Sequence, residues 1–245
     1  MDPVIPGSIS ATAEELRAMA RSASDASGYF IALYARVTAR IAASIRDGRF
    51  VDGGRMDVFA TTFASYCTRA AQNERDRPRC WQACFDVAGD PNLLIVQHLL
   101  LGINAHVNHD LALAVVEVAG PSGRLESIKA DFDAVNDVLA ETYIDVLRAL
   151  DRVSHWTNRA AAAGGGRVFN FSLRVARGQA WSAAERIHAM PTERERAAYI
   201  SELDQVVSVL AYLITRPPIP VRPLVWIARR LEERDPRTVT TALLG

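Results

Sequence analysis

The sequence predicts a single all-α domain spanning residues 1–245, and three observations support this. Apolar residues recur at helical spacing along nearly the whole chain, and no stretch shows the sustained alternation of a β-strand. Recognisable start and stop signals flank the periodic segments. With 245 residues, of which 49% are hydrophobic, the chain can bury a large core without a disulfide or a metal. We expect eight to ten helices around a long buried central helix at about residues 91–119.

Sequence signals in the N-terminal third of the chain predict three helices. Thr12 and Glu15 have the spacing of a capping box, which predicts the start of the first helix. The second is expected over residues 27–46, with Gly48 placed to end it. The Gly53-Gly54 pair separates it from the third.

The middle of the chain predicts a short helix, the central helix and a long partner. Pro78 can start the short CWQACF helix. Asp90-Pro91 supplies an N-cap and an N1 proline for the central helix, and the Gly-Pro-Ser-Gly run at 120–123 ends it. The next helix carries an apolar stripe over residues 125–150.

The C-terminal third predicts further helices joined by irregular segments. These are a flexible loop at 160–167, a helix at 168–188, a helix from a capping box at Thr192 and Glu195 to about Arg216, a stiff proline-rich connector at 217–223, a helix at 224–234 and a frayed tail at 236–245.

Composition excludes several classes of function. The 28 basic and 28 acidic side chains give a net charge of zero, which argues against a nucleic-acid-binding protein. No glycine-rich phosphate loop or dinucleotide fingerprint is present, so we expect no nucleotide cofactor. The first ten residues lack the features of a signal peptide, and we expect a cytoplasmic protein. The three cysteines, Cys67, Cys80 and Cys84, are expected to be small buried apolar residues rather than zinc ligands.

The central segment combines an apolar sequence with a polar cluster. It is long enough to cross a bilayer, but a helix facing lipid rarely carries so many polar side chains near its middle. Those side chains are Gln97, His98, Asn104, His106, Asn108, His109 and Asp110. We therefore expect the core helix of a soluble protein and no transmembrane segment.

His106 and Asp110 are one helical turn apart, so an imidazole nitrogen and a carboxylate oxygen can converge. The pair can form half of a divalent metal site, or the carboxylate can orient His106 as a general base without a metal. A structural pair that only joins helices is the alternative. His109 lies beside the pair, whereas His98 is about 12 Å along the axis and cannot share a metal ion with His106.

Other elements offer partners for this pair. If the central helix and the next one form an antiparallel hairpin, Asn136 or Asp133 approaches His106 and Asp110. We then expect Asn136, like His109, to be a catalytic residue beside this pair, and Asp133 to be a third metal ligand. Arg177 and Trp181 share a helix face. We expect these two, together with His98 and Asn108 of the central helix, to contact a substrate, with ordinary helix packing as the alternative.

Three segments resemble a family of uncharacterised, mostly actinobacterial helical proteins that carry a domain of unknown function. They are LGINAHVNHDLALAV, YARVTARIAASIRDGRF and RVARGQAWSAAERI. The resemblance implies an all-α fold and places His106, Asn108 and Asp110 in the family's polar motif. It implies no reaction.

Two better-known motifs are similar over a shorter stretch. His106 and Asp110 look like the H-x-x-x-D motif of zinc-dependent phospholipase C and P1-type nucleases, but five histidines in the chain cannot fill their trinuclear site. His109-Asp110 is similar to the HD dyad of metal phosphohydrolases, whose upstream histidine on a separate helix is missing here.

These observations lead to two functional hypotheses. The first is a small-molecule enzyme with an apolar helical pocket that uses His106 and Asp110 for acid-base or metal-assisted hydrolysis, isomerisation or cyclisation of a hydrophobic metabolite. The second is a non-catalytic ligand-binding or helical interaction protein in which the polar residues form a structural network. The sequence leaves the presence of a metal and the formation of a homo-oligomer open.

Overall fold

The computed structural model describes residues 8–120, 123–156 and 166–245, with side chains from residue 172 onward in the last range. These residues form helices and no β-strand, as the periodicity predicts. The elements are α1 (Ile9–Ser22), α2 (Ser27–Arg46), α3 (Gly53–Gln72), α4 (Arg79–Phe85), α5 (Ile95–Ala105), the π-helix η1 (His106–Asp110), α6 (Leu111–Ala119), α7 (Glu126–Asp151), α9 (Gly166–Ala189), α10 (Glu193–Thr215), the 3-10 helix η3 (Ile219–Val221), α11 (Arg222–Arg230) and α12 (Pro236–Leu244).

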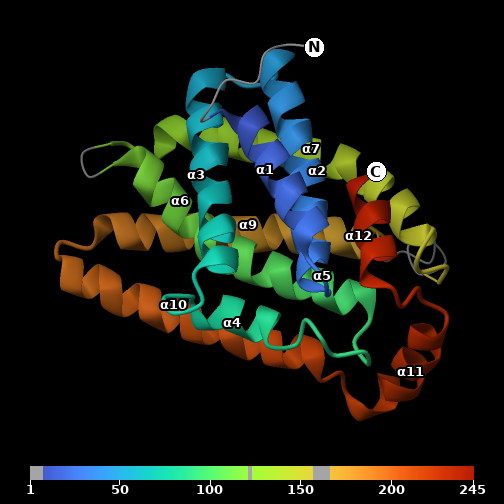
Figure 1. The fold of residues 1–245 in the computed structure, drawn as a ribbon. Helices are drawn as coiled ribbons and strands as arrows, with labels where there is room; N and C mark the ends of the chain where they lie inside the picture. The colour runs from blue at the N-terminus through green and yellow to red at the C-terminus, as the bar shows by residue number, and fades with distance from the viewer. Residues whose placement is uncertain (1–7, 121–122, 157–165) are drawn as a thin grey trace.

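The central helix is continuous through α5, η1 and α6, and the other helices surround it (Figure 1). Helix α2 packs against α5 and also contacts α1, α3, α7 and α12. On another side, α10 packs against α4 and α5, and α9 packs along η1 and α6. Both ends of the central helix are therefore enclosed by helices that are distant in the sequence.

The central helix begins at Ile95, four residues later than the sequence predicts. The side chain of Asp90 caps a local turn by accepting from the backbone N–H of Asn92 at 2.9 Å. The free N–H of Ile95 donates instead to Oε2 of Glu232, at 2.9 Å. A carboxylate 137 residues away in sequence thus supplies the N-terminal cap that Asp90 was expected to provide.

Three other expectations need correction. The first helix begins at Ile9 with Ser8 as its N-cap, one turn before the expected capping box. The expected frayed tail contains α12, where Asp235 accepts from two backbone N–H groups and Val239 is fully buried. The proline-rich connector is interrupted, because η3 lies within it and α11 already begins at Arg222.

Local signals predict other boundaries well. Gly48 follows α2 with φ of +69°, and the Thr192 capping box starts α10. Of the expected loop at 160–167, residues 160–165 lie outside the described residues, and the remaining two begin α9.

The central helix and α7 do not form the expected packed hairpin. Helix α9 packs along η1 and α6, while α7 lies against α2 and α12 (Figure 1). The polar face of η1 therefore has different neighbours from those that the hairpin predicts.

Among the described residues, two helices have the length and composition to cross a membrane. One is the central helix, Ile95–Ala119, whose most apolar window is 67% buried inside the protein. The other is α10, whose window is only 11% buried. Large apolar side chains are exposed along α10 and α11, among them Val209, Leu213 and Trp226. One face of this pair is thus uncovered in the single chain.

Gly102 marks the closest approach of α2 to the central helix. A Cβ atom at this position would lie 2.2 Å from Cγ and 2.4 Å from Cβ of Phe30, atoms that cannot move without moving α2. We predict that Gly102→Ala lowers the free energy of unfolding by about 1–3 kcal/mol. Gly178→Ala in α9 is the matched control, since its Cβ would meet nothing within 4 Å. The control variant should gain about 0.5–1 kcal/mol. Urea denaturation of both variants tests the pair, and equal stability of the two would contradict the packing described.

Candidate functional site

The polar residues of the central helix lie in a π-helical turn. The segment His106–Asp110 forms η1, inserted between two α-helical segments that are mostly apolar. A π-helical turn inside an α-helix is rare and occurs frequently at functional sites. Here it brings two imidazoles, those of His106 and His109, to the buried carboxylate of Asp110.

Asp110 is the centre of this cluster, with 1% of its surface exposed. Its Oδ2 accepts hydrogen bonds from Nε1 of Trp81 at 2.9 Å and from Nδ1 of His106 at 3.0 Å. Its Oδ1 accepts from Nδ1 of His109 at 2.8 Å. Burial raises the pKa of Asp110, but the hydrogen bonds from the two histidines outweigh it and hold the pKa below its usual value. Asp110 is therefore an ionised carboxylate in the core.

The hydrogen bonds to Asp110 determine the tautomer of His106. A carboxylate can only accept, so Nδ1 of His106 carries the proton and Nε2 carries the free lone pair. Burial lowers the pKa of His106, and its hydrogen bond to Asp110 only partly offsets this effect. The imidazole is thus neutral near pH 7, with Nε2 available as an acceptor or a base.

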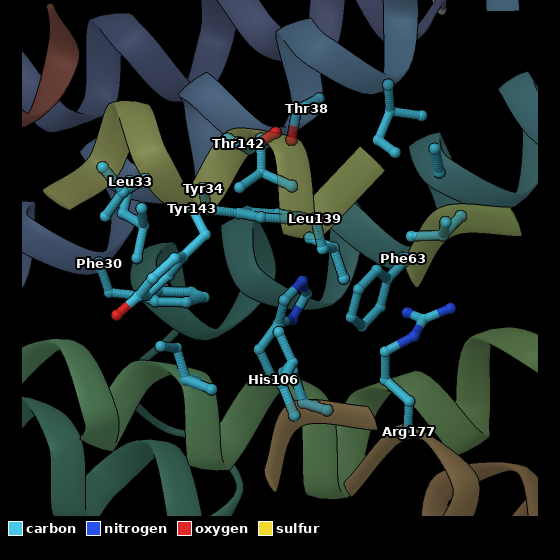
Figure 2. Close-up of a pocket in the computed structure, with 18 of the residues that line it drawn as sticks. Phe30, Leu33, Tyr34, Thr38, Phe63, His106, Leu139, Thr142, Tyr143 and Arg177 are labelled. Carbon is cyan, nitrogen blue, oxygen red and sulfur yellow. The ribbon is translucent and has the colours of Figure 1, made fainter. Parts of the chain in front are cut away.

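Aromatic rings hold the imidazole of His106 on several sides. The ring of Phe63 stacks on it with centroids 3.7 Å apart and planes inclined by 7°. The ring of Tyr34 lies edge-on at 4.3 Å. Figure 2 shows the imidazole standing in a pocket between these two side chains, with Leu139 nearby. The ring therefore cannot swing away from Asp110 without disturbing α2 and α3.

Nε2 of His106 is buried and has no hydrogen-bond partner among the described residues. Beside it is a cavity of about 140 Å³ between α2, α3, α7, η1 and α9. The lining is mostly aliphatic and aromatic, and the described residues that form it include no carboxylate. The polar side chains among them are Tyr34, Thr38, His106, Thr142, Tyr143 and Arg177. A buried polar atom without a partner beside an apolar cavity is the arrangement expected of a ligand site.

Arg177 lies in the wall of this cavity and is 4% exposed. Its Nε donates to Oδ1 of Asn136 at 2.9 Å, and its guanidinium also donates to the backbone oxygen of Phe132. Burial lowers the pKa of Arg177 to about 10, so it remains a cation at neutral pH. Among the described residues it has hydrogen-bond acceptors but no ion pair with a carboxylate. The sequence pairs Arg177 with Trp181, whereas the guanidinium in fact lies over the ring of Phe132.

Several residues expected at the site lie elsewhere. Asn136 is a partner of Arg177 and does not contact Asp110. The half-exposed Asp133 pairs with Lys129, and no described cluster of metal-binding groups joins it to His106 and Asp110. The reason for both placements is that α9 packs on η1 where the hairpin would place α7.

The expected substrate-contacting residues also separate. Asn108 donates to Asn104, which in turn bonds to α10. His98 packs edge-on against Tyr29, with centroids 5.8 Å apart. Trp181 packs against Phe132, with centroids 5.0 Å apart. Of the four residues expected to contact substrate, only Arg177 lines the cavity.

The sequence does not identify the aromatic residues that surround His106 and Asp110 as part of the site. Trp81, Tyr34 and Phe63 come from α4, α2 and α3, and each also fits the ordinary apolar pattern of a core position. Only the indole N–H of Trp81 offers a signal, since a buried tryptophan usually needs an acceptor.

The fold and this site together define an all-helical protein with a buried, carboxylate-oriented histidine beside an apolar cavity. The chain belongs to the family of unknown function DUF5995, whose family model matches residues 9–217. The match includes α1 through α10 and every residue that lines the cavity. No curated protein matches the chain, and no solved structure does.

Buried histidines make the stability of this fold depend on pH. Burial lowers the pKa of His98 from 6.5 to about 4, so the unfolded chain binds a proton that the folded protein resists. The free energy of unfolding should therefore fall as pH falls from 6.5 to 4, with His98 contributing up to about 1.4 kcal/mol per pH unit. Urea denaturation at pH 7, 6 and 5 measures this slope. His98→Gln should reduce it, and an unchanged slope in that variant would contradict the assignment.

Proposed function

We propose that this protein is a small-molecule enzyme in which the apolar cavity binds a hydrophobic substrate and His106, oriented by Asp110, acts as a general base. One observation carries the proposal: Nε2 of His106 is buried beside the cavity without a partner among the described residues. An unsatisfied acceptor in the core costs about 1–3 kcal/mol unless a ligand satisfies it.

The pair supplies what general base catalysis requires. Nε2 can remove a proton from a bound molecule because the imidazole is neutral and its other nitrogen is fixed by Asp110. The imidazolium formed in that step is stabilised by the ionised carboxylate 3.0 Å from Nδ1. Return of the same proton completes a hydrolysis, an isomerisation or a cyclisation without a net change in the enzyme.

The cavity limits the size of the substrate. Its volume of about 140 Å³ is close to that of an apolar protein cavity that binds benzene. The apolar part of the substrate is therefore comparable to one aromatic ring. A polar group on this ring can reach His106 on one side, and the buried cation of Arg177 in the same wall suits a partial negative charge.

A second function is supported by the three hydrogen bonds that Asp110 already accepts from the protein itself. Its three hydrogen bonds join α4 to η1, as in a structural network, and the cavity lining is mostly apolar. On this basis the alternative is a binding protein that holds a hydrophobic ligand and uses His106 only as a hydrogen-bond acceptor.

A matched pair of probes tests the cavity and the acceptor. Phenol and toluene have similar shapes, but only phenol can donate a hydrogen bond to Nε2 of His106. We predict that the ratio of phenol affinity to toluene affinity is about tenfold higher in wild type than in His106→Leu. The reason is that one buried hydrogen bond contributes about 1.5 kcal/mol. Isothermal titration calorimetry measures both affinities. Failure of both probes to bind wild type would refute the ligand cavity, and an unchanged ratio in the variant would refute the role of Nε2.

Turnover distinguishes the enzyme from the binding protein. The assay uses phenyl esters of short acids, together with small aromatic ketones for proton exchange. We predict that His106→Gln reduces kcat by about 10²–10⁴-fold on any substrate that wild type converts. Toluene should still bind to this variant, which separates loss of chemistry from loss of the cavity. Tight binding with no turnover across these compounds supports the binding protein, and retained turnover in His106→Gln rules out the general base.

A further inference from the structure

A second group of side chains includes His109, which bonds to the other oxygen of Asp110, and none of its members lines the apolar cavity. One ligand atom each from Cys80 of α4, His109 of η1 and Asp204 of α10 lies within 4.8 Å of the others. In the part of the chain that the structure describes, these three are the set of metal-binding groups that converge. From this convergence we propose that Cys80, His109 and Asp204 bind one divalent metal ion, with zinc as the preferred ion.

The separation of the ligand atoms is close to that of a tetrahedral zinc site. With bond lengths of about 2.0–2.3 Å, two ligand atoms of such a site lie about 3.5 Å apart. Since the atoms lie within 4.8 Å of one another, each pair needs to approach by about 1.3 Å at most, which is within the reach of side-chain rotation. Three helices that are distant in sequence supply one ligand each.

His109 is already oriented as a metal ligand. Its Nδ1 donates to Oδ1 of Asp110 at 2.8 Å, so the lone pair is on Nε2. A carboxylate that accepts from the far nitrogen of a histidine is the usual support for a metal-bound imidazole, because it fixes both the tautomer and the ring. His109 is 3% exposed, so this orientation is held inside the protein.

Asp204 is held by the backbone at the start of α4. Its two oxygens accept from the N–H groups of Arg79 and Cys80, each at 2.9 Å. These bonds occupy one lone pair on each oxygen and leave others for a cation. No ion pair with an arginine or a lysine neutralises Asp204 among the residues that the structure describes.

The donor set favours zinc over harder cations. Thiolate and imidazole are ligands of zinc, whereas calcium and magnesium prefer oxygen alone. Burial raises the pKa of the Cys80 thiol, which bonds to Asp204, so binding of the ion releases the thiol proton to solvent. The resulting thiolate and one carboxylate neutralise the doubly charged ion, which suits a buried location. Three protein ligands leave a fourth position for water.

The ion would join α4, η1 and α10 through residues that do not line the cavity. Because Asp110 bonds to both histidines, the metal site and His106 share one support. The proposal does not depend on the proposed enzymatic activity, since binding of the ion is measured without a substrate.

The test uses the whole protein, purified without a histidine tag and treated with a chelator. Cobalt(II) is then added, because a cobalt–thiolate bond gives an absorption band in the near ultraviolet. Wild type should show this band at about one cobalt per chain, and zinc should displace it. Cys80→Ser should lose the band and weaken zinc binding by more than about 100-fold, given that outer-sphere partners alone contribute about 10–100-fold.

Cys84→Ser is the matched control, since Cys84 lies one turn further along the same short helix and is also buried but is not part of the group. It should keep the band. Far-ultraviolet circular dichroism shows whether each variant is folded. If Cys80→Ser does not fold, His109→Gln replaces it as the variant that should weaken zinc binding. A wild-type protein that folds and shows no thiolate band with excess cobalt overturns the proposal, as does an equal band in wild type and Cys80→Ser.

Discussion

The carboxylate of Asp110 is the interaction on which the rest of this structure depends. It is an ionised group in the core, and it is tolerated there because three N–H donors surround it. Two of these donors are histidine nitrogens, one on each oxygen of the carboxylate. By accepting from both, Asp110 determines which nitrogen of each ring is left with a lone pair. One side chain thus leaves the lone pair of both imidazoles on Nε2.

The same carboxylate explains why the surrounding helices pack as they do. Trp81 must lie close enough to donate its indole N–H, so α4 is placed against η1 despite having only seven residues. Asp204 of α10 then holds the start of α4 through its backbone. Helices α2 and α3 supply the rings that enclose His106. The hydrogen bonds to Asp110 and the aromatic rings around His106 therefore hold the same imidazole in place. The cavity is the space beside this imidazole that the surrounding side chains leave unfilled.

Local patterns in the sequence were sufficient for the fold class and for the core of the site. The i, i+4 spacing of His106 and Asp110 indicates their contact, and a glycine or a capping box marks the ends of α2 and the start of α10. What could not be predicted depends on tertiary contacts. The cap that Glu232 gives to Ile95, the packing of α9 in place of α7 and the docking of α12 are all set by residues far apart in sequence. Cys80 and Asp204 likewise read as an ordinary core residue and an ordinary helix residue until the fold brings them to His109.

The π-helical turn has a consequence for how this site can change during evolution. A π-helix contains one more residue per turn than an α-helix, so η1 is equivalent to a single-residue insertion into an otherwise regular helix. Five residues of a π-helix turn about the axis through nearly the same angle as four residues of an α-helix, so deleting one residue there would restore a regular α-helix while α5 and α6 kept nearly their present faces. Gly102 would still face Phe30 and Asn104 would still face α10, so the change would be confined to the five residues that carry the two imidazoles and Asp110. Loss of the extra residue in a descendant of this chain would therefore remove the site and leave the packing of the helices around it.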